Sequence, residues 1–214
     1  MVGLRLDGVK EMKSEIITLP SQPILIVDIE GNGQNPPDLV EISILKFDYK
    51  STLENKSITW LIKPQNPIKS RVTRIHGIKN RDVLNSPTWS DIKSEVLSFL
   101  GGAWFVAHNA KLDYDVIKRH LPEWEPAGII DTLRLSRYVL PNAPSHSLKN
   151  LINYAGLLPD ISGSFHRASF DAQATSELFK FLIDKANISN WNEICLLSQV
   201  NIKPEKKDRK STRL

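Results

Sequence analysis

The first residues with the chemistry of an active site are two acids at the end of an apolar run. Asp28 and Glu30 end the run 23–30, and residues two apart in a β-strand project from the same face. Burying two like charges there is costly unless a positive charge compensates, so the pair favours a metal site. The alternative is that the strand simply ends here and both acids are solvated.

Two further acids and a histidine follow at positions from which they could join this pair. Asp113 begins a predicted helix after the apolar run 104–109, and Asp171 lies five residues after His166 in the first turn of a long predicted helix. In a sheet covered by helices, the ends of neighbouring strands and the starts of the following helices gather at one edge. We therefore expect four carboxylates to converge. Alternatively, Asp113 and Asp171 are acids favoured by a helix dipole, and His166 is a solvated or capping side chain.

Several converging carboxylates suit the hydrolysis of a phosphodiester. That reaction requires charge on a phosphate to be neutralised, hydroxide to form near neutral pH and an alkoxide leaving group to be stabilised. Two divalent ions about 3.5 to 4 Å apart can do all three together. The acids therefore predict a two-metal hydrolytic site.

The elements that would position these residues alternate between strands and helices after an initial meander. Strands are expected at 23–30, 39–49 and 57–64, joined as three antiparallel strands, and then at 104–109 and 128–131. Apolar spacing and helix end signals predict helices at 89–100, 111–120, 132–140, 147–154 and 168–185. This order predicts a three-layer α/β domain with a mixed five-stranded sheet.

The composition is that of one soluble domain. The chain has 214 residues, of which 41% are hydrophobic and 24% charged. Cys195 is its only cysteine, which excludes a disulfide scaffold. No apolar run is long enough for a membrane span, and the first residues do not resemble a signal peptide, so we expect a cytoplasmic protein without a membrane partner.

The net charge of +4 comes from a basic tail. From Lys203 onward six basic residues face two acidic ones, which leaves 22 of each sign in residues 1–202. We divide the chain into an N-terminal extension (1–20) without a motif, a catalytic domain (21–200) and a basic tail (201–214) predicted to be disordered. The tail is either a solubilising end or an arm that attracts nucleic acid.

The three acidic motifs, in this order, resemble those of the DEDDh exonucleases of the ribonuclease H-like superfamily. The family includes the proofreading subunit of bacterial DNA polymerase III. The matching segments are VDIE at 27–30, VAHNAKLD at 106–113 and HRASFD at 166–171, with shorter matches at 75–78, 131–133 and 147–151. The resemblance covers about residues 24–184 and implies a ribonuclease H-like three-layer α/β/α fold.

The resemblance also implies a mechanism. Asp28, Glu30, Asp113 and Asp171 would bind two Mg²⁺ or Mn²⁺ ions, and His166 would be the general base. The tyrosine-type branch has Tyr where this chain has Arg167, so the chain resembles the histidine branch. The implied activity is metal-dependent 3′–5′ hydrolysis at single-stranded or frayed DNA 3′ ends, releasing nucleoside 5′-monophosphates. A DNA polymerase or repair protein is the implied partner.

Six further residues match family positions that contact or support the substrate: Ile29, Gly31, Ile75, His76, Asn109 and Leu112. Ile29 and Gly31 stand where Thr is frequent, which removes a hydroxyl contact to the terminal nucleotide. Ile75 and Leu112 could alternatively be core residues. His76 could be a polar residue beside a helix cap, and Asn109 a turn former. Outside the matched positions, His108 is expected in the core and His120 and His146 on the surface.

Two alternative functions remain. An exoribonuclease acting on RNA 3′ ends would use the same chemistry and differ in its tolerance of a 2′-hydroxyl. A catalytically idle, polymerase-associated nucleic-acid-binding module is disfavoured, because it would have no reason to retain five buried polar groups that lower stability. The sequence carries no indication of an oligomeric state.

Overall fold

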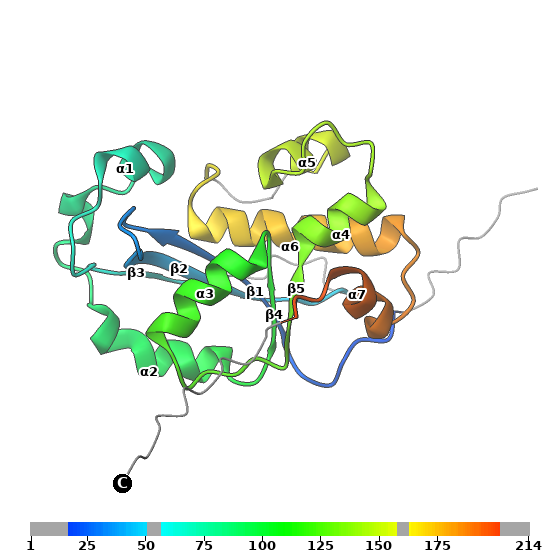
Figure 1. Ribbon diagram of the computed structural model, residues 1–214, viewed down its shortest axis with the longest axis horizontal. Coiled ribbons are helices and arrows are strands. Elements are labelled where there is room, and N and C mark those ends of the chain that lie inside the picture. The colour runs from blue at the N-terminus through cyan, green and yellow to red at the C-terminus, as the bar shows by residue number, and fades with distance from the viewer. Residues whose placement is uncertain (1–16, 51–56, 158–162, 202–214) are drawn as a thin grey trace, which may run out of the picture.

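Five strands form one mixed sheet in the order β3-β2-β1-β4-β5 (Figure 1). The computed structural model describes residues 17–50, 57–157 and 163–201. The strands are β1 (Ile24–Gly31), β2 (Leu39–Lys46), β3 (Ile58–Leu61), β4 (Trp104–Ala107) and β5 (Gly128–Asp131). β2 pairs antiparallel with β1 and β3, whereas β4 pairs parallel with β1 and β5. The predicted antiparallel meander and mixed sheet are confirmed.

Helices cover both faces of this sheet. They are α1 (Ser70–His76), α2 (Trp89–Leu100), α3 (Ala110–His120), α4 (Thr132–Val139), α5 (Leu148–Ala155), α6 (Ala168–Lys185) and α7 (Trp191–Ser198), with a 3-10 helix η1 (Asn80–Val83). The sequence did not predict α1, η1 or α7. α1 and η1 have only seven and four residues, too few for their apolar residues to show a helical period.

The hydrophobic core has one part on each face of the sheet. Ile24 and Ile26 of β1 pack on the side of α4 to α7, whereas Leu25 and Val27 pack on the side of α2 and α3. β2 is buried on both faces from Leu39 to Leu45, although its pattern predicted one buried face. The three-layer arrangement follows from this two-sided burial.

The residues directly before β1 pack against the core of the domain. Ile17, placed by the sequence in the N-terminal extension, is buried in the core on the α6 side. Thr18 is hydrogen-bonded to Ser189 and Trp191, which joins this segment to the region before α7. Residues 1–16 and 202–214, and with them nearly all of the predicted tail, lie outside the described residues. In the described part of the chain no helix is long and apolar enough to cross a bilayer.

Candidate active site

β1 presents two acids to the side of the sheet covered by α6. Asp28 and Glu30 alternate with Val27 and Ile29, and so share a face with the buried Ile24 and Ile26. Glu30 lies directly opposite Glu41 of β2, and the register shifts immediately after it, at Gly31. The side chains of Glu30 and Glu41 thus lie side by side on one face of the sheet where β1 ends.

Asp113 reaches the same place from the first turn of α3. That helix begins at Asn109, whose left-handed backbone (φ 66°) turns the chain out of β4. The N–H of Asn109 donates to Asp131 Oδ1 at 2.9 Å, and the same oxygen accepts from the N–H of Leu133. Asp131 therefore fixes the starts of both α3 and α4, and Asp113 is buried against the backbone of Ile29.

The third contribution comes from the start of α6. His166 has a φ of 69°, and its N–H donates to Asp171 Oδ2 at 3.0 Å. Asp171 Oδ1 is buried and has no hydrogen-bond partner among the described residues. Glu30, His166 and Asp171 each offer one atom within 4.8 Å of the others, an arrangement that could hold a metal ion. An oxygen-rich donor set with an unsatisfied carboxylate oxygen fits Mg²⁺ or Mn²⁺.

All four predicted carboxylates have a raised pKa, and burial is the largest cause in each case. The pKa of Glu30 rises to about 8 and that of Asp113 to about 7. For Asp28 the pKa is well above its usual range, because the negative charges of Asp113, Asp171 and Glu30 add to burial. Asp171 also has a raised pKa, although the hydrogen bond from the His166 N–H opposes the shift. The acids thus interact as one cluster whose negative charge a divalent cation would neutralise.

One ion pair of the site, between the buried Glu41 and the partly exposed Arg167, was not predicted from the sequence. Glu41 is only 1% exposed and accepts from Arg167 Nη2 at 2.6 Å, from Arg167 Nε at 3.2 Å and from the N–H of Ala168 at 2.8 Å. It therefore joins β2 to the start of α6, which carries Asp171 and directly follows His166. A single acid within the apolar run LVEISIL was the available signal.

The predicted substrate contacts differ in burial. Ile75 is 50% exposed and Leu112 is 63% exposed, so neither is a core residue. His76 is buried, its Nδ1 accepts from the N–H of Ile78 at 3.1 Å, and its Nε2 has no hydrogen-bond partner among the described residues. Burial lowers the pKa of His76, while the backbone of the nearby Gly31 opposes that shift.

The remaining predicted contacts and histidines are half-buried. Ile29 packs against the core on the α2 and α3 side, and Asn109 lies at the start of α3. His108 bridges Thr132 Oγ1 at 3.0 Å and the carbonyl of His146 at 2.9 Å, which agrees with a structural role. His120 and His146, expected on the surface, are also half-buried.

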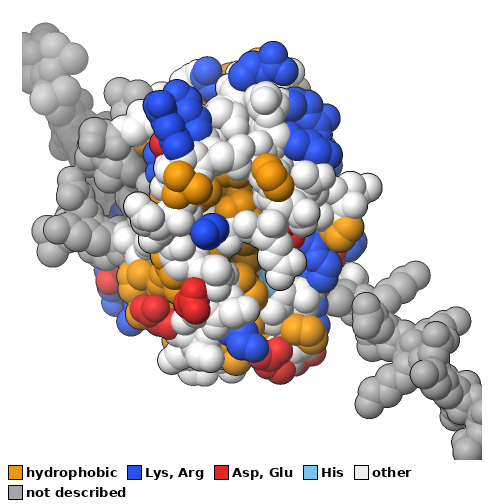
Figure 2. Space-filling view, turned by 90° about the vertical axis from the view of Figure 1, so that its left-hand side faces the viewer, with side chains coloured by type: hydrophobic (Ala, Val, Ile, Leu, Met, Phe, Trp, Pro, Cys, Tyr) orange, Lys and Arg blue, Asp and Glu red, His pale blue; other side chains and the backbone are white. Residues whose placement is uncertain are grey.

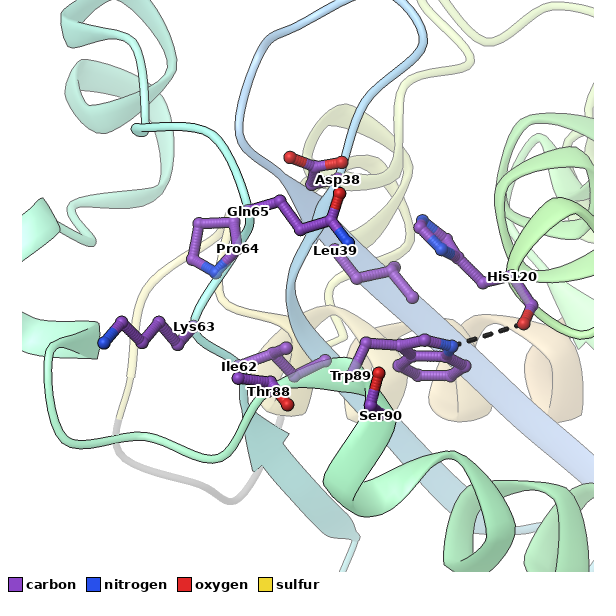
Figure 3. A pocket seen from close by; sticks show the side chains of 10 residues that line it. All are labelled: Asp38, Leu39, Ile62, Lys63, Pro64, Gln65, Thr88, Trp89, Ser90 and His120. Carbon is purple, nitrogen blue, oxygen red and sulfur yellow. Dashed lines mark hydrogen bonds between the residues drawn. The ribbon is translucent and has the colours of Figure 1, made fainter.

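A separate cavity of about 510 Å³ opens beside the start of α2 (Figure 3). Trp89 and His120 lie against each other on one side of it, with Trp89 Nε1 donating to the carbonyl of His120 at 3.2 Å. Its only acid, Asp38, already accepts from Asn32 and from the N–H of Asn66. None of the four clustered carboxylates lines this cavity.

Comparison with known proteins places this arrangement in a family. The model of the RNase_T family, described as exonuclease, matches residues 25–179. The PolC-type DNA polymerase III of Caldanaerobacter subterraneus subsp. tengcongensis is 28% identical over 210 residues, covering 92% of this chain and 14% of the polymerase. The 3′-5′ exonuclease DinG of Bacillus subtilis is 29% identical over 174 residues, covering 77% of this chain and 18% of DinG. The chain thus spans a small part of the length of either relative.

Solved structures show the same fold. Exonuclease X in complex with 5′ overhanging duplex DNA superposes with a TM-score of 0.64 at 26% identity, over 77% of this chain and 93% of that one. Exonuclease I of E. coli, in complex with a dT13 oligonucleotide, gives a TM-score of 0.66 at 16% identity, over 78% of this chain and 42% of that one. The three-layer fold and the family resemblance predicted from the sequence are both confirmed.

Proposed function

This chain is a nuclease of the RNase_T exonuclease family, and from that premise we propose that it hydrolyses phosphodiester bonds at the 3′ end of DNA. It depends on two Mg²⁺ or Mn²⁺ ions and releases nucleoside 5′-monophosphates. The observation that carries the proposal is the convergence of Asp28, Glu30, Asp113 and Asp171 beside His166, with Asp171 Oδ1 buried and without a partner.

The four carboxylates hold the metal ions in this proposal. Bound divalent ions neutralise charge on the phosphate and stabilise the leaving oxygen. Glu41 and Arg167 act indirectly, because their ion pair fixes the start of α6 and so the position of Asp171. The backbone N–H of His166 holds one oxygen of Asp171, which leaves the other oxygen available as a ligand.

His166 is the general base. Its side chain is exposed and has a ring nitrogen within 4.8 Å of a carboxylate oxygen of Glu30 and of Asp171, so it can reach a water molecule at the edge of the carboxylate cluster. A neutral imidazole takes a proton from this water as the water oxygen attacks the phosphorus of the last phosphodiester. The P–O3′ bond breaks, and the 3′ oxygen leaves on the shortened strand and takes up a proton from solvent. The released nucleotide leaves with its 5′-phosphate.

DNA with an accessible 3′ end is the proposed substrate. The name of DinG and the complex of Exonuclease X with 5′ overhanging duplex DNA support this choice. Ile75 and Leu112, exposed apolar side chains next to His76 and Asp113 in the sequence, provide contacts for the last base or its sugar. Ile29, Gly31, His76 and Asn109 complete the proposed contact set. Similarity to PolC-type polymerases supports a DNA polymerase or repair protein as partner.

One gel experiment tests this function. Single-stranded DNA, duplex DNA and RNA, each with a 5′ label, are incubated with Mg²⁺, with Mn²⁺ or with a chelator. We expect a ladder of products shortened from the 3′ end on DNA in either metal and no product in the chelator. Preferential cleavage of RNA would favour an exoribonuclease, and uncut DNA in both metals would refute the proposal.

A further inference from the structure

A local excess of positive charge lies in the segment that contains α1. Between residues 63 and 81 the chain has six basic residues and no acidic one: Lys63, Lys69, Arg71, Arg74, Lys79 and Arg81. Residues 1–202 contain equal numbers of acidic and basic residues, so the excess is a feature of this segment. The local excess at residues 63–81 was not predicted from the sequence, where only the tail was recognised as basic.

This basic segment is held against the turn that follows the catalytic strand. The N–H of Lys69 donates to the carbonyl of Asn32 at 3.0 Å. Gly33 packs so closely on α1 that a β-carbon there would lie 2.9 Å from Val72 Cγ1. Asn80 closes the segment at its other end, since its side chain accepts from the N–H of Ile68 at 2.8 Å and donates to the carbonyl of Ile68 at 3.0 Å. The backbone that carries these cations is therefore held against Asn32 and Gly33, which follow β1.

Most of these cations are available to bind an anion. Lys69, Arg71, Arg74 and Lys79 are exposed. Among the segment's cations, the described structure shows an ion pair only for Arg81, with Asp82 at 3.6 Å. Figure 2 shows Lys and Arg side chains gathered at the top of this face of the molecule, at the height of α1. We call Lys69, Arg71, Arg74 and Lys79 the α1 surface.

We propose that the α1 surface binds backbone phosphates of the nucleic acid strand upstream of its terminal nucleotide. This inference rests on the proposed function and adds to it the path of the substrate. The carboxylate cluster repels a polyanion, and a neighbouring cationic surface offsets that repulsion over the rest of the strand. Ile75 lies between Arg74 and the buried His76 on the same helix, so the surface continues into the proposed site for the last nucleotide. Phosphate contacts hold a strand in place regardless of its base sequence.

The test compares Arg71→Gln/Arg74→Gln with a control that removes two exposed cations elsewhere, Lys93→Gln/Lys185→Gln. The melting temperature of each variant first shows that it is folded. Binding of a fluorescein-labelled single-stranded oligonucleotide is then measured by anisotropy in chelator, where no turnover takes place, at increasing salt. Each lost phosphate contact lowers the slope of log affinity against log salt by about 0.7. We therefore expect a clearly flatter slope for the α1 variant and an unchanged slope for the control.

A second measurement compares kcat/KM for the oligonucleotide with kcat/KM for a dinucleotide, which has no phosphate upstream of the scissile one. The ratio should fall in the α1 variant and stay unchanged in the control. An equal loss of kcat/KM on both substrates, or an unchanged slope of log affinity against log salt, would refute phosphate binding by the α1 surface. A wild-type protein that cleaves neither substrate would contradict the proposed function instead, and the anisotropy data would still decide whether the α1 surface binds the strand.

Discussion

Glu41 shows how a residue that contacts no reacting atom can determine the geometry of the site. It is buried opposite Glu30, where another negative charge is unfavourable, yet it accepts three hydrogen bonds from Arg167 and Ala168. Glu41 thus connects β2 to the start of α6, and through α6 to Asp171. In the proposed site Glu41 therefore has a positioning role.

Replacing Glu41 by Gln should weaken this connection. The amide keeps the shape of the side chain but loses the charge-assisted pair. The side chain of Arg167 is 45% exposed and can turn to water, so we expect a loss of about 1 to 2 kcal/mol in unfolding free energy, together with lower turnover. Denaturant melts and initial rates measure both effects. The control is Glu125→Gln, which removes an exposed pair with Lys118 and should change stability by less than about 1 kcal/mol. Equal effects of the two substitutions would refute the role of Glu41.

A His166 variant distinguishes a role in proton transfer from a role in metal binding. A nitrogen of its ring lies within 4.8 Å of a carboxylate oxygen of Glu30 and of Asp171, so a role as a metal ligand is the competing explanation. If it is the base, His166→Ala should lower kcat by roughly 10² to 10⁴ and leave metal affinity nearly intact, because the four carboxylates remain. Calorimetric titration with Mn²⁺, run beside Asp113→Ala, distinguishes the two roles. A loss of affinity in His166→Ala as large as that in Asp113→Ala would make His166 a ligand.

At the level of structural elements, α1 packs closely against one glycine, Gly33. Gly33 has a φ of 77°, and any β-carbon there would meet Val72. Gly33→Ala should therefore lose about 1 kcal/mol from the backbone and about 1 to 3 kcal/mol more from overpacking. Gly156→Ala is the matched control, since its φ is 68° but a β-carbon there meets nothing within 4 Å. Thermal melts of both variants test this. A Gly33→Ala protein as stable as Gly156→Ala would show that α1 does not pack on this turn as described.

How far the elements could be predicted depends on their length and on where their partners lie. The strand that carries Asp28 and Glu30 is recognisable from its apolar run, and the eighteen-residue α6 from its helical spacing. α1 gives no such signal, because its seven residues include two arginines and show no apolar period. The pair of Glu41 and Arg167 joins positions 126 residues apart, and no local pattern specifies a contact of that range.

The residues of the candidate site were more predictable than the contacts that position them. Asp28, Glu30, Asp113, His166 and Asp171 stand at motif spacings at the ends of strands or the starts of helices, so topology alone brings them to one edge. Exposure was not predictable in the same way, because Ile75 and Leu112 have the composition of core residues and only the fold leaves them at the surface. Roles for the six proposed substrate contacts remain predictions.

For the molecule as a whole, the raised pKa values make stability depend on pH and on metal. Glu30 has a pKa of about 8 and Asp113 of about 7 in the folded state, above their ordinary values of 4.5 and 3.8. The folded protein therefore holds protons that the unfolded chain releases, and this contribution to stability is lost as pH rises from about 4 to about 8. In chelator we expect a lower melting temperature at about pH 8 than at about pH 5, and added Mg²⁺ should raise the value at pH 8 most. A melting temperature in chelator that rises over this range would contradict the description of the acids.

The central claim is that the carboxylate cluster binds the metal that hydrolysis requires. Asp113 and Asp115 lie two residues apart on α3, but Asp113 is buried in the cluster, whereas Asp115 is exposed and paired with Lys111. The most direct measurement is the rate at which Asp113→Asn and Asp115→Asn shorten 5′-labelled DNA from its 3′ end in Mg²⁺. We expect Asp113→Asn to be inactive and Asp115→Asn to retain the wild-type rate. Full activity in a folded Asp113→Asn protein would contradict the assignment of this cluster as the catalytic metal site.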